Sequence, residues 1–144
     1  MLGGYDTARA QTAIEHDDAF VVATADGWTI GSSAIRYTVG FDTGGTLVLR
    51  DLRASVDTPS LRPTVQRDGL FRIDGREMSL TRSDTRGFRF NGADTADTGG
   101  GVQLRLTFES ASDGVRATRV YAAYPGVAAV ELWTELVSTT SDET

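Results

Sequence analysis

The chain has 144 residues, of which 40% are hydrophobic and none is cysteine, and its formal net charge is -6 at pH 7. This length supports a single hydrophobic core, and the lack of cysteine excludes disulfide bonds and thiolate metal sites. The negative charge argues against nucleic acid or an anionic membrane as the partner, because phosphate binding requires clustered positive charge.

Residues 1–18 are predicted to be an N-terminal extension ahead of the folded domain. They lack the charged start and the long apolar stretch of a secretory signal, and no run of 18 apolar residues follows, so we expect a cytoplasmic protein without a membrane span. Only residues 7–17 could form a short helix, although their apolar spacing fits a helix poorly. His16, the single histidine, is interpreted as an exposed side chain beside carboxylates; a metal-binding or general-base role is the alternative.

Residues 19–138 carry the alternation of apolar and polar residues that is typical of half-buried strands. The alternation is clearest in residues 35–41 and 102–109. The other predicted strands are residues 20–23, 46–52, 70–74, 78–81, 88–90, 115–124 and 127–137, which makes about nine strands in all. The pattern predicts one all-β domain.

Four Asp-Gly pairs indicate tight turns between strands, because both residue types tolerate a positive φ. The pairs are Asp26-Gly27, Asp68-Gly69, Asp74-Gly75 and Asp113-Gly114. Strands joined by such turns run antiparallel, so the domain is predicted to be an antiparallel β-sandwich.

Residues 91–101 contain no side chain large enough to anchor in a core, and we expect a mobile loop there. Asp94 and Asp97 lie in this segment beside three glycines, but they match neither the alternating acidic spacing nor the glycine-rich repeat of a calcium loop. We therefore predict no metal site in it. Residues 139–144 are expected to form a polar, flexible tail.

The last apolar segment alternates in the same way and is predicted to be a strand. In it, Val130, Leu132, Thr134 and Leu136 alternate with Glu131, Trp133, Glu135 and Val137. One set should face the core and the other the opposite side of the sheet. The residues that we expect in the core are Leu104, Leu106, Phe108, Val130, Leu132 and Leu136.

Glu131 and Glu135 are the carboxylates to test for glycosidase chemistry, which needs two carboxyl groups about 5–5.5 Å or 6.5–9.5 Å apart. On a strand, four residues at about 3.3 Å each separate the two by about 13 Å, which is too far for a catalytic pair. No Gly-rich phosphate loop or nucleophile elbow is present. We therefore predict no catalytic residue, no metal site and no cofactor in this chain.

Trp133 lies between Glu131 and Glu135 on the face opposite the leucines. Because aromatic rings stack on the apolar face of a sugar and carboxylates accept its hydroxyl groups, these three side chains are candidate carbohydrate contacts. Trp28, which follows the Asp26-Gly27 turn, is a fourth candidate. The alternative for both tryptophans is that a further layer covers the sheet, so that the rings are buried.

The C-terminal stretch contains Tyr121-Ala-Ala-Tyr-Pro-Gly126 followed by a hydrophobic strand with a central Trp133. It resembles the N-terminal β-supersandwich domain of the α-galactosidase (melibiase-like) glycoside hydrolases, where a strand ends in Tyr-x-x-Tyr-Pro-Gly. The earlier order is also similar, with a tyrosine-bearing strand at residues 35–39, a Gly-Gly-x-Leu strand at residues 44–49 and a Phe-x-Ile-Asp-Gly-Arg hairpin. The resemblance covers residues 19–138 and implies a supersandwich of the galactose-mutarotase type.

In that family the sandwich precedes a (β/α)₈ barrel that holds the catalytic aspartates, none of which maps onto this chain. The family's sandwich also has further strands, so the resemblance implies an incomplete sandwich that pairs with the missing barrel domain or self-associates, with Trp133 at the contact. It implies a non-catalytic accessory domain of a glycoside hydrolase acting on α-galactoside-type sugars. The alternative is a stand-alone carbohydrate-binding or protein-interaction module. The single histidine disfavours an enzyme in its own right, such as a sugar mutarotase.

Overall fold

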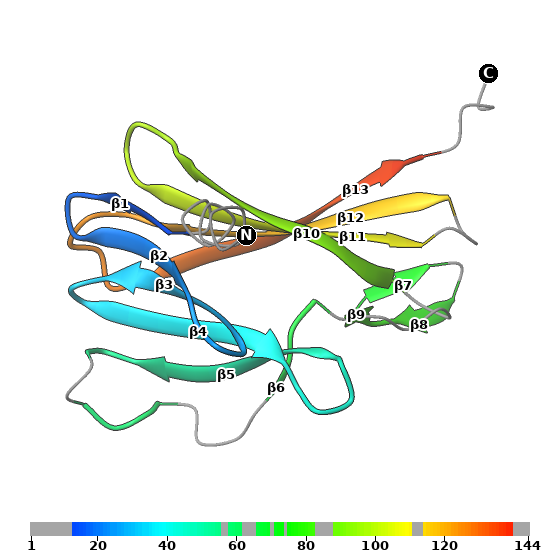
Figure 1. Cartoon of the computed structure of the whole chain (residues 1–144), viewed down its shortest axis with the longest axis horizontal. Helices are drawn as coiled ribbons and strands as arrows, with labels where there is room; N and C mark the ends of the chain where they lie inside the picture. The colour runs from blue at the N-terminus through cyan, green and yellow to red at the C-terminus, as the bar shows by residue number, and fades with distance from the viewer. Residues whose placement is uncertain are drawn as a thin grey trace, which may run out of the picture.

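The computed structural model describes residues 13–55, 58–61, 66–69, 71–73, 75–82, 88–110 and 114–139. Every regular element within these ranges is a β-strand, and the strands form two main sheets and one small hairpin (Figure 1). Among the residues described, no helix could cross a membrane. The predicted all-β class is therefore confirmed.

The first sheet is a six-stranded antiparallel meander in which each strand pairs with the next one in sequence. Its strands are β1 (Ile14–His16), β2 (Ala19–Ala23), β3 (Gly27–Ser32), β4 (Ile35–Phe41), β5 (Leu47–Arg53) and β6 (Gln66–Arg67). A tight turn joins β2 to β3, and in it the Thr24 N–H donates to the Gly27 carbonyl at 2.7 Å. The hairpin predicted at Asp26-Gly27 is therefore confirmed.

The second sheet is curled and has the strand order β13-β12-β11-β10-β9. Its strands are β9 (Leu80–Thr81), β10 (Phe88–Asp97), β11 (Val102–Ser110), β12 (Val115–Ala123) and β13 (Val130–Ser138). It is a mixed sheet, because β9 and β10 run parallel while the other neighbours are antiparallel. A separate hairpin of β7 (Phe71–Ile73) and β8 (Arg76–Met78) turns at Gly75, where φ is 80°, as the Asp-Gly pair predicts.

The core lies between the two main sheets and is built around an aromatic cluster. Trp28 and Phe41 come from the first sheet, and Phe90 and Phe108 come from the second. The rings of Trp28 and Phe90 are 5.8 Å apart and those of Phe41 and Phe108 are 6.2 Å apart, at tilted angles that aromatic pairs favour. These contacts hold the two sheets face to face.

The segment 91–101, expected to be a loop, is mostly strand. Residues Ala93 to Asp97 belong to β10 and pair one by one with residues of β11. The expectation was based on small side chains, but a strand needs only a partner for its backbone N–H and C=O groups, which β11 supplies. The turn itself is short: the Thr98 N–H donates to the Gly101 carbonyl at 3.0 Å, and Gly99 has a φ of 89°.

The start of the described chain also differs from the expectation. Residues 14–16 form the edge strand β1 of the first sheet instead of part of a helix, and Ile14 packs against the core. The folded sheet therefore includes residues assigned to the N-terminal extension. Of the segment that could have formed a short helix, residues 7–12 lie outside the described residues.

Asp68-Gly69 was expected to form a hairpin turn, and this prediction is wrong. The two residues follow β6, and the Asp68 side chain, only 6% exposed, enters the core, where it accepts hydrogen bonds from Arg119 and Tyr121 on β12. Gly69 is required there, because its φ is 80° and a Cβ would lie 2.5 Å from Leu80 Cδ1. The pair thus connects the end of the first sheet to the second.

The core prediction is confirmed for β11. On β13 it is confirmed in part for Val130, which is partly buried and packs against the core, and it is wrong for Leu132 and Leu136. Leu104, Leu106 and Phe108 are fully buried, whereas Leu132 is 37% and Leu136 is 52% exposed. The predicted face is nevertheless the observed one, because Leu132 pairs with Tyr121, which is buried in the core. β13 is the last strand of its sheet and packs mainly against β12, and this edge position leaves Leu132 and Leu136 partly uncovered.

The Tyr-Pro-Gly stretch forms the turn between β12 and β13 and is tied to the first sheet. The Asp18 carboxylate accepts hydrogen bonds from the Gly126 N–H at 2.9 Å and from the Ser33 N–H at 3.0 Å. The Ser32 hydroxyl donates to the Val127 carbonyl at 2.9 Å. These bonds fix the position of β13 relative to the core.

Candidate functional site

Polar side chains gather on the outer face of the second sheet, the face turned away from the core. The strand register aligns them in two rows. One row is Asp94, Arg105, Val120 and Trp133, and the other is Gly92, Thr107, Thr118 and Glu135. We call these eight residues the outer-face site. It joins β10, β11, β12 and β13.

An ion pair crosses this face above β12. Arg105 lies on β11 and Glu135 on β13, so the intervening strand separates them by about 9–10 Å of backbone. Their side chains nevertheless meet, with Arg105 Nη2 and Glu135 Oε1 2.6 Å apart. The bridge explains why Val120 and Thr118, which point outward from β12, are buried although no further strand covers them among the described residues.

Trp133 is held beside this ion pair. Its indole N–H donates to Glu135 Oε2 at 3.1 Å, and the ring is partly exposed. The hydrogen bond from Trp133, together with Arg105, lowers the pKa of Glu135 below its ordinary value. Glu135 is therefore an ionised acceptor at neutral pH, and Trp133 is a fixed aromatic surface next to it.

A polar hollow of about 420 Å³ continues from Arg105 toward β10. It is lined by Asn91, Gly92, Ala93, Asp94, Arg105, Thr107, Arg116 and Thr118. The register shift between Phe90 and Gly92 bends β10 at this point. No atom lies within 4 Å of the position that a Cβ on Gly92 would take. The missing side chain therefore leaves free space in the hollow at this residue.

Glu131 lies on the same outer face of β13, beyond Trp133. It is exposed and accepts a hydrogen bond from the Tyr124 hydroxyl at 2.8 Å, which raises the pKa of Tyr124. Since β13 is a strand, Glu131 and Glu135 are four residues apart on one face, about 13 Å along it. Their placement does not resemble a glycosidase pair.

Trp28, the other predicted contact, does not lie at this site. Its side chain is only 9% exposed and packs between the sheets against Phe41 and Phe90. Alternation alone could not distinguish a ring on a covered face from a ring on an open one. Trp28 is a core residue.

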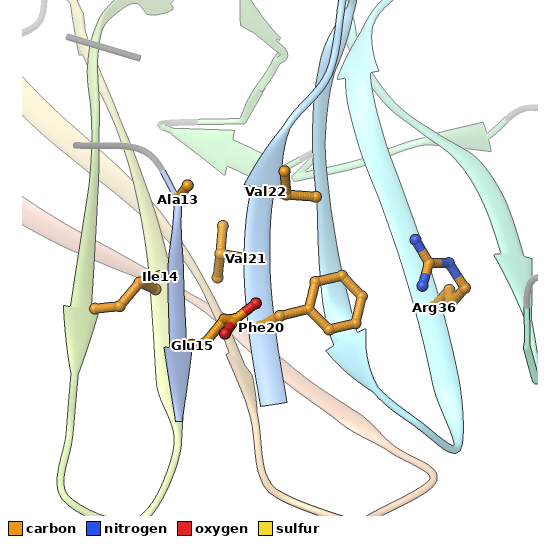
Figure 2. A pocket seen from close by; sticks show the side chains of 7 residues that line it. All are labelled: Ala13, Ile14, Glu15, Phe20, Val21, Val22 and Arg36. Carbon is orange, nitrogen blue, oxygen red and sulfur yellow. The ribbon is translucent and has the colours of Figure 1, made fainter. Parts of the chain in front are cut away.

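Another hollow, of about 520 Å³, lies on the outer face of the first sheet (Figure 2). Phe20 projects across it from β2 toward Arg36 on β4, whose guanidinium lies 4.9 Å from the ring centroid. The register places Gly31 of β3 between them, and the missing side chain there lets the two meet. Because the Arg36 guanidinium already lies over one face of the Phe20 ring, that ring has less free surface for a ligand than the Trp133 ring has.

His16 and Asp97, which the sequence suggested to be two exposed side chains, contact each other. His16 Nδ1 lies 3.1 Å from Asp97 Oδ2 and links β1 to β10. The hydrogen bond with Asp97 raises the pKa of His16. A hydrogen bond from the Gly99 N–H, together with the one from His16, lowers the pKa of Asp97. In the described part of the chain, no group of three or more His, Cys, Asp or Glu side chains could hold a metal ion.

Only the β13 part of the outer-face site, Trp133 and Glu135, was predictable from the alternation in the sequence. Arg105, Thr107 and Thr118 were not predicted, although they occupy polar positions of two alternating strands. What the sequence could not show is the register, which aligns these positions with Trp133 and Glu135.

A scan against protein-family models, a search of curated proteins and a search of solved structures found no match.

Proposed function

We propose that the chain is a non-catalytic carbohydrate-binding β-sandwich domain and that the outer-face site binds the sugar. The observation that carries this proposal is the partly exposed Trp133 ring, fixed by Glu135, whose ion-pair partner Arg105 lines a polar hollow. A fixed aromatic surface with charged acceptors and donors around it is the chemistry that a sugar ring requires.

The site offers contacts for both the apolar face and the hydroxyl groups of a sugar. The apolar C–H face would stack on Trp133, while Glu135 and Asp94 accept hydrogen bonds from hydroxyl groups and Arg105 donates them. The hollow of about 420 Å³ is within the range of small-ligand sites. Because Arg105 and Glu135 bind each other at 2.6 Å, both side chains are already positioned before a ligand arrives.

The wider role that we propose is an accessory domain of a glycoside hydrolase acting on α-galactoside-type sugars, with a supersandwich of the galactose-mutarotase type. It rests on the resemblance of the Tyr-x-x-Tyr-Pro-Gly stretch and the strand after it. The two opposed sheets are compatible with that architecture. The alternative is a stand-alone binding module, and a barrel encoded directly downstream of this chain would favour the accessory domain.

Isothermal titration calorimetry with a small α-galactoside such as melibiose tests the proposal. We expect saturable binding by the full chain and at least about tenfold weaker binding by Trp133→Ala. Trp133→Phe should retain part of the affinity because it keeps an aromatic ring. Phe20→Ala, which removes the aromatic ring from the other sheet's hollow, is the matched control and should bind as the parent does.

Two results would contradict the proposal. The first is no saturable binding of any α-galactoside or other neutral sugar by the parent chain. The second is binding that Trp133→Ala leaves unchanged. If Phe20→Ala lost the binding instead, the sugar site would lie on the first sheet.

A further inference from the structure

β13 has an open edge on the side away from β12, as far as the described residues show. β12 pairs with β13 on one side over all nine residues of β13, and no described strand pairs with it on the other. The strand contains no proline, and its core-side residues Leu132 and Leu136 are 37% and 52% exposed. Long edges of this kind can pair with another strand.

The direction of the backbone groups along this edge follows from one hydrogen bond. The Thr139 N–H donates to the Gly114 carbonyl at 2.7 Å, and these two residues continue the β12–β13 register by one step. In an antiparallel ladder, hydrogen-bonded and non-hydrogen-bonded pairs alternate. The N–H and C=O groups of Leu132, Thr134 and Leu136 therefore point away from β12, toward the open edge.

We propose that β13 pairs antiparallel with β13 of a second copy of this chain, about a two-fold axis at Thr134. Thr134 is the middle residue of the strand, so this register pairs the strand over its whole length. Thr134 then forms a hydrogen-bonded pair with its own copy, and Leu132 forms one with Leu136 of the second copy. The outward-pointing backbone groups of all three residues are satisfied.

The side chains select this register over its neighbours. Centred on Thr134, the pairing sets Trp133 opposite Glu135 of the second copy and Glu131 opposite Val137, so no two carboxylates face each other. A centre at Glu135 sets two copies of Glu135 against each other, and a centre at Trp133 sets Glu131 against Glu135. Like charges directly opposite each other destabilise a strand pair. On the core side, the exposed leucines meet across the axis.

Light scattering and single-cysteine cross-linking of the full chain test this dimer and its register. At about 100 μM we expect the mass of a dimer. The chain has no cysteine, so each introduced thiol reports alone. In the proposed register Thr134→Cys places its thiol next to its own copy, at a Cα separation of about 5.5 Å that a disulfide can span. Leu132→Cys, the matched control, lies about 13 Å along the strand from its copy.

We expect oxidised glutathione to convert Thr134→Cys to a covalent dimer at least about tenfold faster than Leu132→Cys. Leu136→Pro removes one N–H at the open edge and none that bonds to β12, so it should give a folded monomer by circular dichroism and light scattering. A monomeric parent at this concentration would overturn the proposal and leave the edge to a further strand of a longer sandwich. Equal cross-linking of both cysteine variants would overturn the register.

Discussion

At the scale of single residues, the Asp68 carboxylate is a buried charged group that joins the end of the first sheet to β12. Its Oδ1 lies 2.6 Å from Arg119 Nη2, and its Oδ2 accepts a hydrogen bond from the Tyr121 hydroxyl. All three side chains are buried or nearly so. Burial, with the neighbouring Asp68 charge, raises the pKa of Tyr121 well above its ordinary value, so the phenol stays a neutral donor. Arg119 also donates to the Thr134 hydroxyl at 3.0 Å, which extends the network to β13.

We predict that Asp68→Ala destabilises the fold by about 3–5 kcal/mol, because it leaves the Arg119 charge buried without a partner. Urea unfolding followed by fluorescence measures the loss. The double variant Asp68→Leu with Arg119→Met removes both charges and should recover most of the stability. Asp94→Ala, at an exposed carboxylate, is the control and should change the free energy of unfolding by less than about 0.5 kcal/mol. A loss below about 1 kcal/mol for Asp68→Ala would show that the pair contributes little.

At the scale of elements, the alternation of residue types predicted most strands and their faces. It did not predict the second half of β10, because the small side chains there show no alternation and the strand is stabilised by backbone pairing with β11. It also failed at Asp68-Gly69, since a dipeptide does not show that its carboxylate will meet Arg119, which lies 51 residues later. Pairings between distant segments decide both features. The register that assembles the outer-face site is unpredictable for the same reason.

The edge position of β13 leads to a prediction about two leucines of equal size. Leu106 on β11 is fully buried, whereas Leu136 on β13 is 52% exposed. Leu106→Ala should therefore cost about 2–5 kcal/mol of stability. Leu136→Ala should cost less than about 1 kcal/mol when measured at a concentration where the chain is monomeric. Equal costs in urea unfolding would mean that β13 is covered in solution.

The tie between β1 and β10 predicts a pH dependence of stability. Asp97 raises the pKa of His16 above its ordinary value of 6.5, so protonated His16 is favoured in the folded state. This stabilisation is fully present below pH 6.5 and is lost as the pH rises through the raised pKa. Thermal unfolding of the parent should therefore shift to lower temperature over that range relative to Asp97→Asn. Parallel pH profiles for the two proteins would contradict the prediction.

At the scale of the whole molecule, two sheets enclose one core, and the polar groups that could bind a ligand lie on outer faces. Catalysis would require reactive groups converging on a single point. The two carboxylates of the outer-face site instead lie on different strands, Asp94 on β10 and Glu135 on β13, and Glu131 lies outside the site, beyond Trp133. This spread does not match the pair of nearby carboxyl groups that glycoside hydrolysis needs.

We therefore predict no turnover of an aryl α-galactoside by the purified chain. The assay measures release of the coloured phenol at protein concentrations high enough to reveal even slow hydrolysis. Glu131→Gln and Glu135→Gln are the diagnostic variants, because either would abolish an activity that used this pair of carboxylates. Turnover by the parent that both variants lose would contradict the prediction.

The division of the core between early and late parts of the chain has a consequence for synthesis. The first sheet ends in sequence at Arg67, but its apolar face is covered by strands that begin at Phe88 and end near Ala123. The hydrogen bond from the Gly126 N–H to the Asp18 carboxylate forms later still, because the two residues are 108 positions apart in the sequence. At roughly 5–20 residues per second, a ribosome leaves this face uncovered for about 3–11 s. During that time a chaperone can bind the nascent chain, and the native fold can close only after the residues up to Gly126 have been translated.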